Sequence, residues 1–180
     1  MIGIAASGRE GPASANLSPV RRSFAFPPRT IFPVFLAFLW LFGASPAAEA
    51  ANRRDLARDE KRGGHTLSRH VGLSDAALRE RLKREQRISA ASTYTDRLTA
   101  EEAVTAAITT NKKRVDAWAA REGSRANLVI DWPGKGKILG RSLRRGDKAP
   151  VPCTRALVIL KWNTETEIYY VLTSYPEASR

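Results

Sequence analysis

The sequence predicts an α+β fold in which N-terminal helices are followed by an antiparallel sheet. Two segments between residues 74 and 120 carry apolar side chains at helical spacing, whereas the segments beyond Gly123 are short and rich in β-branched and aromatic residues. Helices that precede strands favour this arrangement over an alternating parallel one. Because the 180 residues include one cysteine, packing rather than disulfide bonds must hold the fold together.

Residues 1–50 have the features of a cleaved signal peptide. An apolar run from Ile31 to Phe42 is shorter than the roughly 20 residues that a membrane-spanning helix needs. Arginines precede this run, and Ala48-Glu49-Ala50 follows it with the small-x-small pattern of a signal peptidase site. An uncleaved membrane anchor is the alternative. In both cases the rest of the chain is expected to be periplasmic or secreted, and cleavage would leave it without stable membrane association.

The segment after the leader is dense in charge. Residues 51–62 lack apolar periodicity and lead into a double glycine, which predicts a charged, flexible linker before a folded domain at 63–180. The whole chain has 30 basic and 18 acidic side chains and a net charge of +12. This excess indicates a polyanionic partner, which could be nucleic acid, an anionic membrane surface or an acidic protein.

Two helical stretches are expected at the start of the domain. Ser74 is a suitable N-cap for a helix over residues 75–86, in which two leucines four apart form a buried face. Thr99 followed by Glu102 has the spacing of a capping box and predicts the start of a second stretch. Its pattern indicates a break near residues 109–111.

The last third of the chain predicts strands. The four expected strands cover residues 127–132, 137–143, 156–162 and 167–174. The final two are apolar runs separated by Asn-Thr-Glu-Thr, so they pair most simply as an antiparallel hairpin. Side chains alternate between the faces of a strand, which places Thr173 and Tyr175 on the same face.

Both histidines, His65 and His70, lie in one seven-residue segment, GHTLSRH. Histidine is the side chain best suited to move protons in both directions near neutral pH. A spacing of five does not match the i, i+4 pair of a zinc helix, and neither cysteines nor carboxylates cluster nearby. No glycine-rich phosphate loop with Walker spacing is present either. The sequence therefore predicts no metal site and no cofactor.

Five segments together carry a family resemblance: GGHTLSRHVG at 63–72, LRERL at 78–82, ASTYTD at 91–96, ILGR at 138–141 and YYVLTSYP at 169–176. They resemble the bacterial ribonuclease A-like toxin domain at the C-terminal tips of contact-dependent growth-inhibition effectors. The resemblance spans residues 63–176 and implies a ribonuclease A-like fold without disulfides. A difference from that family is the short leader in place of a giant delivery filament, so the resemblance does not extend to delivery into a target cell.

The resemblance implies a catalytic set of His70, Arg81, Thr173 and Tyr175. These side chains suit RNA cleavage, because the 2′-hydroxyl of RNA is its own nucleophile and requires only a base, an acid and a cation for the developing phosphorane charge. Arg81 fits the cation role, and His70 fits the base or the acid. The second proton-transfer group stays open between His65, Tyr175 and Lys161, with His65 favoured on chemistry.

The expected function is therefore that of a secreted, metal-independent endoribonuclease toxin that cleaves single-stranded RNA through a 2′,3′-cyclic phosphate. A non-catalytic basic module that binds nucleic acid or an anionic envelope polymer is the alternative, and a domain that serves protein–protein contact alone is a third reading. Possible partners besides RNA include an acidic immunity or inhibitor protein that covers the cleft. The arginines expected to bind RNA phosphates are Arg69, Arg84, Arg141, Arg144 and Arg145.

Overall fold

The computed structural model describes residues 52–178, so the expected signal peptide and its cleavage site lie outside the described residues. None of the helices in this range combines the length and the apolar character that a membrane span requires. The elements in chain order are α2 (Leu56–Glu60), α3 (Thr66–His70), α4 (Asp75–Arg84), β1 (Ala90–Tyr94), α5 (Arg97–Thr110), α6 (Lys112–Ala119), β2 (Leu128–Trp132), β3 (Gly140–Arg144), β4 (Val151–Cys153), β5 (Arg155–Asn163) and β6 (Ile168–Glu177).

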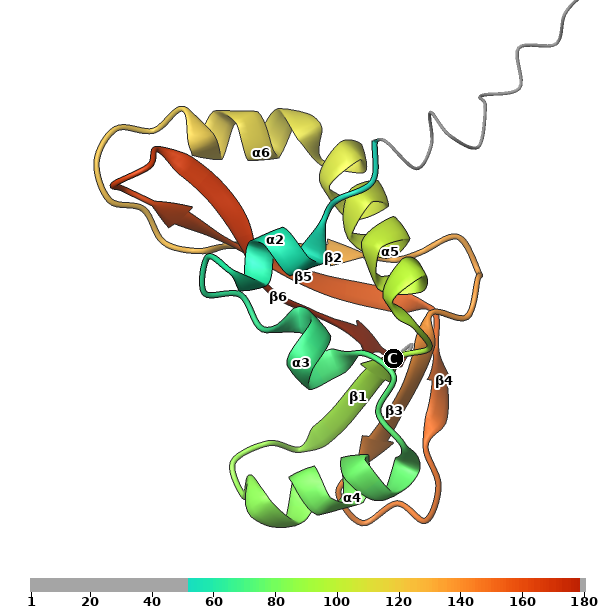
Figure 1. Cartoon of the computed structure of the whole chain (residues 1–180). Helices are drawn as coiled ribbons and strands as arrows, with labels where there is room; N and C mark the ends of the chain where they lie inside the picture. Colours follow the sequence, from blue (N-terminus) through green and yellow to red (C-terminus); the bar gives the residue numbers. More distant parts are fainter. Residues whose placement is uncertain (1–51, 179–180) are drawn as a thin grey trace, which may run out of the picture. The chain divides into compact units, whose positions relative to one another are not determined.

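The strands form two three-stranded antiparallel sheets, with the orders β1-β3-β4 and β2-β5-β6 (Figure 1). The predicted hairpin is confirmed, because β5 pairs with β6 from Arg155 opposite Glu177 to Asn163 opposite Ile168. A register shift between Ile159 and Leu160 interrupts this pairing. Strand β6 also contacts β1 and β3, so it connects the two sheets. The α+β class is confirmed, with two antiparallel sheets in place of one.

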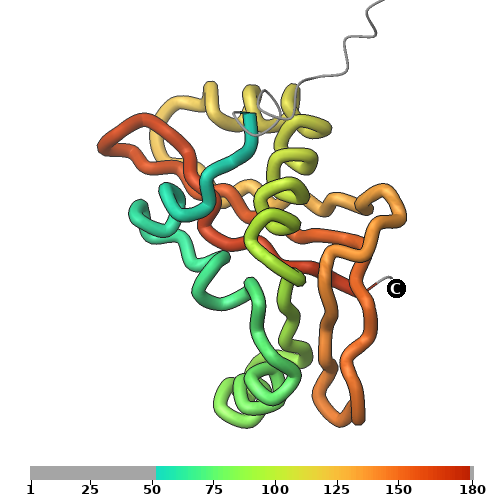
Figure 2. The backbone as a smooth tube through the Cα atoms, turned by 45° about the vertical axis from the view of Figure 1, so that its right-hand side comes forward, coloured from blue at the N-terminus to red at the C-terminus, as the bar shows by residue number. Residues whose placement is uncertain are grey.

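Each sheet has its own helical cover. Helices α5 and α6 pack on β2-β5-β6, where Val104 and Trp118 join a core that includes Ile130 and Val158. Helix α4 packs on β1 and β3, and Figure 2 shows it beside β1, at the same end as the turn between β3 and β4. The residues of this smaller core are Leu78, Leu82, Ala91 and Leu143. Burial of these side chains removes apolar surface from water and stabilises both layers.

The predicted start of α4 is confirmed, whereas that of α5 is wrong by one turn. Ser74 Oγ accepts a hydrogen bond from the backbone of Ala77 at 3.2 Å, as expected of an N-cap. In α5 the cap is Asp96, whose Oδ1 accepts from Thr99 N at 2.7 Å. A carboxylate three residues earlier thus takes the place of the Thr99 hydroxyl. The predicted break is present, because α5 ends at Thr110 and α6 begins at Lys112.

The expected flexible linker contains a helix that packs into the fold. The side chain of Asp55 caps α2 by accepting from two backbone amides, and Leu56 is fully buried in the main core. Asp59 is buried as well, and Arg54 binds it with Nη2–Oδ1 at 2.5 Å and Nε–Oδ2 at 2.8 Å. The segment shows no apolar periodicity because Leu56 is its only side chain in the main core. The buried ion pair between Arg54 and Asp59 supplies the remaining packing interaction of the segment.

Strand β1, between α4 and α5, has no counterpart among the expected strands. Its residues from Ala91 to Tyr94 are all buried, so the apolar–polar alternation that identifies a strand is absent. A Cβ atom at Gly140 would lie 2.0 Å from the carbonyl oxygen of Thr93. Only glycine therefore allows β3 to approach β1 this closely.

Candidate active site

A cleft of about 680 Å³ opens between α3, α4, the β1–β3 pair and the C-terminal half of β6. It is lined by all four side chains of the expected catalytic set, which come from three different elements of the fold: His70, Arg81, Thr173 and Tyr175. The residues span more than a hundred positions in the sequence, and the contact of β6 with α3 and β1 brings them together.

His70 ends α3 and is 7% exposed. Its Nδ1 lies 3.3 Å from the carbonyl oxygen of Ser92 and 3.5 Å from Nη1 of Arg81. A carbonyl oxygen only accepts, and Arg81 already has another acceptor, so we assign the ring proton to Nδ1. Burial, and next the positive charge of Arg81, lowers the pKa of His70 to about 4. The imidazole is therefore neutral near pH 7, with an unprotonated Nε2.

Arg81 is held through two of its nitrogens. Its Nε lies 3.3 Å from Oε2 of Glu85 one turn along α4, and Nη1 donates to the carbonyl oxygen of Arg69 at 3.0 Å. Burial raises the pKa of the Glu85 carboxyl, but the charge and hydrogen bond of Arg81 outweigh this and lower it overall. Nη2 of Arg81 has no hydrogen-bond partner among the described residues. These donors are free for an anionic ligand in the cleft.

Thr173 and Tyr175 both face the cleft from β6, as strand alternation predicts. Thr173 is 7% exposed, and its buried Oγ1 has no hydrogen-bond partner within residues 52–178. Such an unpaired hydroxyl costs free energy unless a ligand pairs with it. The Tyr175 ring lies 5.2 Å from the ring of His70, and burial followed by the charge of Glu177 raises the pKa of its hydroxyl. Tyr175 thus keeps its proton at neutral pH.

The two auxiliary candidates differ in position. His65 precedes α3 and lines the cleft, where burial and then the charge of Arg69 lower its pKa. Lys161 is exposed on β5, opposite Tyr170 in the strand register, and does not line the cleft. Position therefore favours His65 over Lys161 as an auxiliary group.

The expected RNA-binding arginines fall into two groups. Arg144 lines the cleft, while Arg69 and Arg84 line an adjoining pocket of about 400 Å³ that shares Arg81 with it. Arg141 instead donates to Asp75 at 2.6 Å and to the carbonyl oxygen of Leu73 at 2.7 Å, which fastens α4 to β3. Likewise Arg145 donates to the carbonyl oxygens of Glu85 and Ile88, and neither Arg141 nor Arg145 lines these two cavities.

Several cleft residues were not identified from the sequence. Ser92 and Ser142 lie opposite each other in the β1–β3 register and both line the cleft, as do Arg87 and Glu177. Ser92 falls within the ASTYTD segment, which was the one available signal. In the described part of the chain, no group of three His, Cys, Asp or Glu side chains is arranged to hold a metal ion.

The fold and cleft define a ribonuclease A-like toxin domain. Residues 64–176 match the family model described as the bacterial CdiA-CT RNAse A domain, and the chain belongs to this family. The resemblance drawn from the five sequence segments is thereby confirmed. Membership supports a toxin with nuclease activity.

A solved structure agrees with this assignment. The chain is similar to one in the crystal structure of a CdiA-CT/CdiI complex from Y. kristensenii 33638, with 30% sequence identity and a TM-score of 0.56. The similarity covers 63% of this chain and 99% of that chain. No curated protein matches the sequence.

Proposed function

We propose that this protein is a secreted, metal-independent endoribonuclease toxin that cleaves single-stranded RNA. The observation that carries the proposal is the single cleft shared by a neutral imidazole, a partly buried guanidinium and two hydroxyls, in a chain of the CdiA-CT RNAse A family. In the proposed reaction the 2′-oxygen forms a bond to phosphorus, the bond from phosphorus to the 5′-oxygen breaks, and a 2′,3′-cyclic phosphate results.

His70 is the proposed base. With Nδ1–H directed at Ser92, its Nε2 takes the proton from the 2′-hydroxyl as the attack begins. A pKa of about 4 makes the free imidazole a weak base. A phosphodiester anion bound beside it would raise that pKa, since an opposite charge nearby favours the protonated ring. Substrate binding thus strengthens the base.

Arg81 is the proposed stabiliser of the transition state. The bonds to Glu85 and to the Arg69 carbonyl fix the plane of the guanidinium, so its free donors are oriented before substrate arrives. Negative charge grows on the non-bridging phosphoryl oxygens as the phosphorane forms, and fixed donors in a partly water-excluded cleft favour that state. Arg81 is 14% exposed, which limits competition from water.

Tyr175 is the proposed acid for the 5′-oxygen. It is adjacent to His70 and keeps its proton at neutral pH, whereas the lowered pKa of His65 leaves that ring mostly without the proton an acid must supply. Thr173 would donate its unpaired Oγ1 hydrogen to a base edge or a phosphate. Arg69, Arg84 and Arg144 would bind neighbouring phosphates.

The export route and the inhibitor belong to the same proposal. The leader at residues 1–50 would deliver the domain to the periplasm or beyond, and cleavage after Ala50 would release it. An acidic immunity protein would cover the cleft, because a basic domain attracts an anionic partner. The similar chain from Y. kristensenii is seen in a complex with CdiI, which supports a partner of this kind.

The experiment that tests this function is cleavage of a single-stranded oligoribonucleotide by the purified protein in the presence of a chelator, with the matching oligodeoxyribonucleotide as control. We expect the RNA to be cut, the DNA to remain intact and the first products to end in 2′,3′-cyclic phosphate. RNA binding without cleavage would indicate the non-catalytic module, and activity that disappears with chelator would contradict metal independence.

A further inference from the structure

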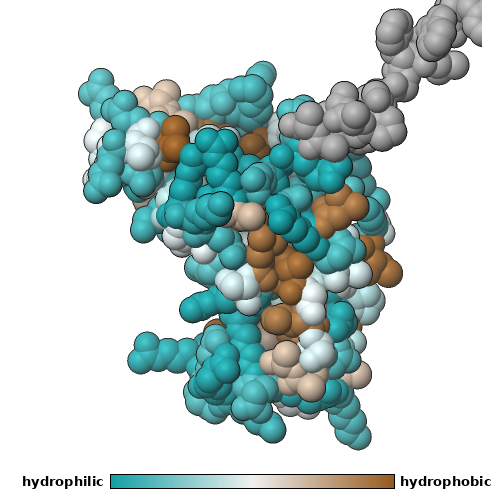
Figure 3. All heavy atoms as spheres, viewed as in Figure 1, coloured by the Kyte–Doolittle hydropathy of each residue, from teal (hydrophilic) through white to brown (hydrophobic). Residues whose placement is uncertain are grey.

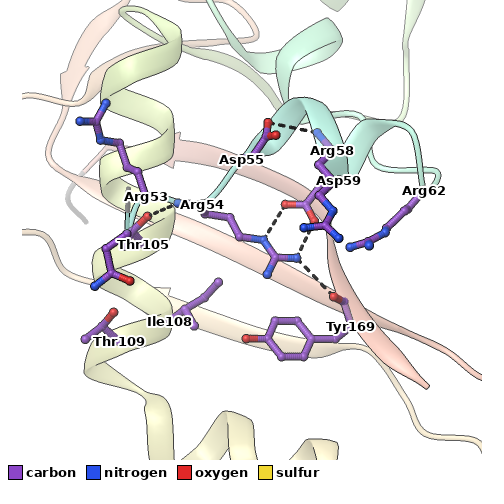
Figure 4. A pocket seen from close by; sticks show the side chains of 11 residues that line it. Arg53, Arg54, Asp55, Arg58, Asp59, Arg62, Thr105, Ile108, Thr109 and Tyr169 are labelled. Atoms are coloured by element: carbon purple, nitrogen blue, oxygen red, sulfur yellow. Dashed lines mark hydrogen bonds and ion pairs between the residues drawn. The ribbon is translucent and has the colours of Figure 1, made fainter. Parts of the chain in front are cut away.

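A second basic cavity, of about 500 Å³, lies between α2, α5 and the start of β6 (Figure 4). Four arginines line it, together with two aspartates and Tyr169. Arg54 occupies the centre, where it binds Asp59 and donates to the carbonyl oxygen of Tyr169 at 3.2 Å. Its guanidinium also lies over the Tyr169 ring, 5.2 Å from the centroid. Arg54 is thus committed to the fold.

Both carboxylates of the cavity are occupied as well. Asp59 is buried against Arg54. Asp55 Oδ1 accepts from the backbone amides of Ala57 and Arg58 and lies 3.2 Å from Nη2 of Arg97. Neither carboxylate makes an ion pair with one of the other three arginines at this site.

The other three arginine side chains of the cavity have no hydrogen bond or ion pair among the described residues. They are Arg53, Arg58 and Arg62, which we call the α2 arginine surface. In Figure 4 Arg58 and Arg62 project to one side of the cavity, and Arg53 lies on the other. The face around α2 is hydrophilic in Figure 3. Unpaired guanidinium groups around a cavity of this size suit an anionic group the size of a nucleotide.

The α2 arginine surface lies close to the cleft. Arg62 precedes the cleft residue His65 by three positions, so their Cα atoms are at most about 11 Å apart. On β6, Tyr169 lines the basic cavity and Thr173 lines the cleft, four residues further along the same strand. That strand spacing corresponds to about 13 Å. A single RNA strand leaving the cleft past His65 can reach Arg62 within a few nucleotides.

We propose that the α2 arginine surface binds phosphates of the RNA strand that extends beyond the cleft, an inference that rests on the proposed ribonuclease function. Residues 53–62 precede the family match, which begins at 64, so the three arginines lie outside the matched segment. It would increase affinity for long RNA and leave the chemistry of the cleaved bond unchanged.

The test compares a dinucleoside monophosphate, which fills only the cleft, with a long single-stranded oligoribonucleotide. The variant is the full chain carrying Arg58→Gln and Arg62→Gln, and the matched control carries Arg121→Gln and Lys135→Gln, two exposed residues outside both cavities. Circular dichroism checks that all forms are folded. An Arg58→Lys/Arg62→Lys form tests whether positive charge alone suffices.

For the variant we expect KM for the long substrate to rise about tenfold with kcat unchanged, and kcat/KM for the dinucleoside to stay constant. Each phosphate contact of a single strand contributes about 0.7 to the slope of log affinity against log salt, so the slope should become shallower by about 1.4. The lysine form should keep the wild-type slope, and the control should match wild type on both substrates.

Three results would overturn the inference. The variant could bind and cleave long RNA as wild type does, with an unchanged salt slope, or it could lose kcat/KM equally on both substrates. It could also lose only affinity for an acidic protein. Failure of the ribonuclease proposal looks different, because then neither substrate is cleaved by any form. In that case affinity for an uncleavable 2′-deoxy oligonucleotide still reports whether Arg58 and Arg62 bind phosphates.

Discussion

Nη1 of Arg81 lies 3.5 Å from Nδ1 of His70, although the two side chains belong to different helices. A permanent positive charge at this distance opposes protonation of the imidazole, in addition to the larger effect of burial. The same charge attracts the phosphate whose arrival would favour protonation. Arg81 thus adds to the effect of burial on His70 in the free protein, and in the proposed mechanism it would bring in the group that raises the basicity of the ring.

His70→Ala should abolish most RNA cleavage. A positioned acid or base contributes about 10²- to 10⁴-fold in rate, so kcat should fall by that factor. The measurement is single-turnover cleavage of an oligoribonucleotide, with affinity for an uncleavable analogue as the check on binding. Full activity in a folded His70→Ala protein would remove His70 from the mechanism.

Arg81→Lys should be nearly as damaging despite the retained charge. A lysine ammonium cannot donate to Glu85, to the Arg69 carbonyl and to a phosphoryl oxygen in one plane. Loss of a fixed donor to a developing oxyanion costs about 10²- to 10³-fold in kcat. Glu85→Ala, which leaves Arg81 in place but frees its Nε, should give a smaller loss. Equal kcat values for wild type and Arg81→Lys would mean that charge alone is sufficient.

The low pKa of His70 predicts a pH-dependent stability. Because the pKa is lowered on folding from 6.5 to about 4, the neutral ring stabilises the fold fully above the unfolded value, and this contribution is lost as pH falls toward the folded value. Each unit of pKa corresponds to about 1.4 kcal/mol, so the loss approaches about 3 kcal/mol. Denaturant unfolding of wild type and His70→Gln, at neutral and at acidic pH, isolates this difference.

The same titration gives a second readout. Nuclear magnetic resonance of the His70 ring should show a low pKa in the free protein and an upward shift when a phosphate or an uncleavable nucleotide is added. A ring pKa that does not respond to a ligand bound in the cleft would contradict the proposed increase in basicity.

Thr173→Val should separate stability from activity. Oγ1 is buried without a partner, so replacing the hydroxyl with a methyl group should leave the free energy of unfolding unchanged or increase it by about 1 kcal/mol. If substrate pairs with this hydroxyl, kcat/KM should fall by about tenfold, the equivalent of one hydrogen bond. A stable variant with undiminished kcat/KM would assign Thr173 to the cleft wall alone.

The parts of the fold that the sequence predicts are those with regular periodicity. The Ser74 cap and the leucines that follow it predict α4, and the two apolar runs around Asn163 predict the β5–β6 hairpin. Helix α2 was missed because Leu56 is its only apolar core side chain. Its other buried side chain, Asp59, is held by an ion pair, which leaves no apolar pattern in the sequence. β1 was missed because tertiary packing buries its polar residues along with its apolar ones.

The site was predictable only where side chains identify it. His70 and Arg81 came from the family resemblance, and strand alternation placed Thr173 with Tyr175. No residue pattern indicates that the backbone carbonyl of Ser92 faces the imidazole, because that contact arises when α3 packs on β1. The same limit applies to Arg141, whose contact with Asp75 depends on how α4 lies against β3.

A buried hydrogen-bond network behind the cleft yields the last prediction. The Tyr94 hydroxyl lies 2.6 Å from Ser174 Oγ, and Ser174 N donates to Oγ1 of Thr66 at 2.9 Å. Ser174 stands between the two proposed site residues of β6, while Thr66 begins the helix that ends at His70. Tyr94→Phe would leave the Ser174 hydroxyl buried without its partner, which costs about 1–3 kcal/mol.

Because the network joins β1 and α3 to the part of β6 that lines the cleft, Tyr94→Phe should also lower kcat, with KM for the dinucleoside little changed. Adding Ser174→Ala removes the orphaned hydroxyl, so the double variant should regain stability, and the coupling energy measured by the cycle isolates the Tyr94–Ser174 bond. If the network positions the site, kcat should stay low in the double variant even though stability returns. Recovery of kcat together with stability would show that the network serves folding and has no separate part in positioning Thr173 and Tyr175 in the cleft.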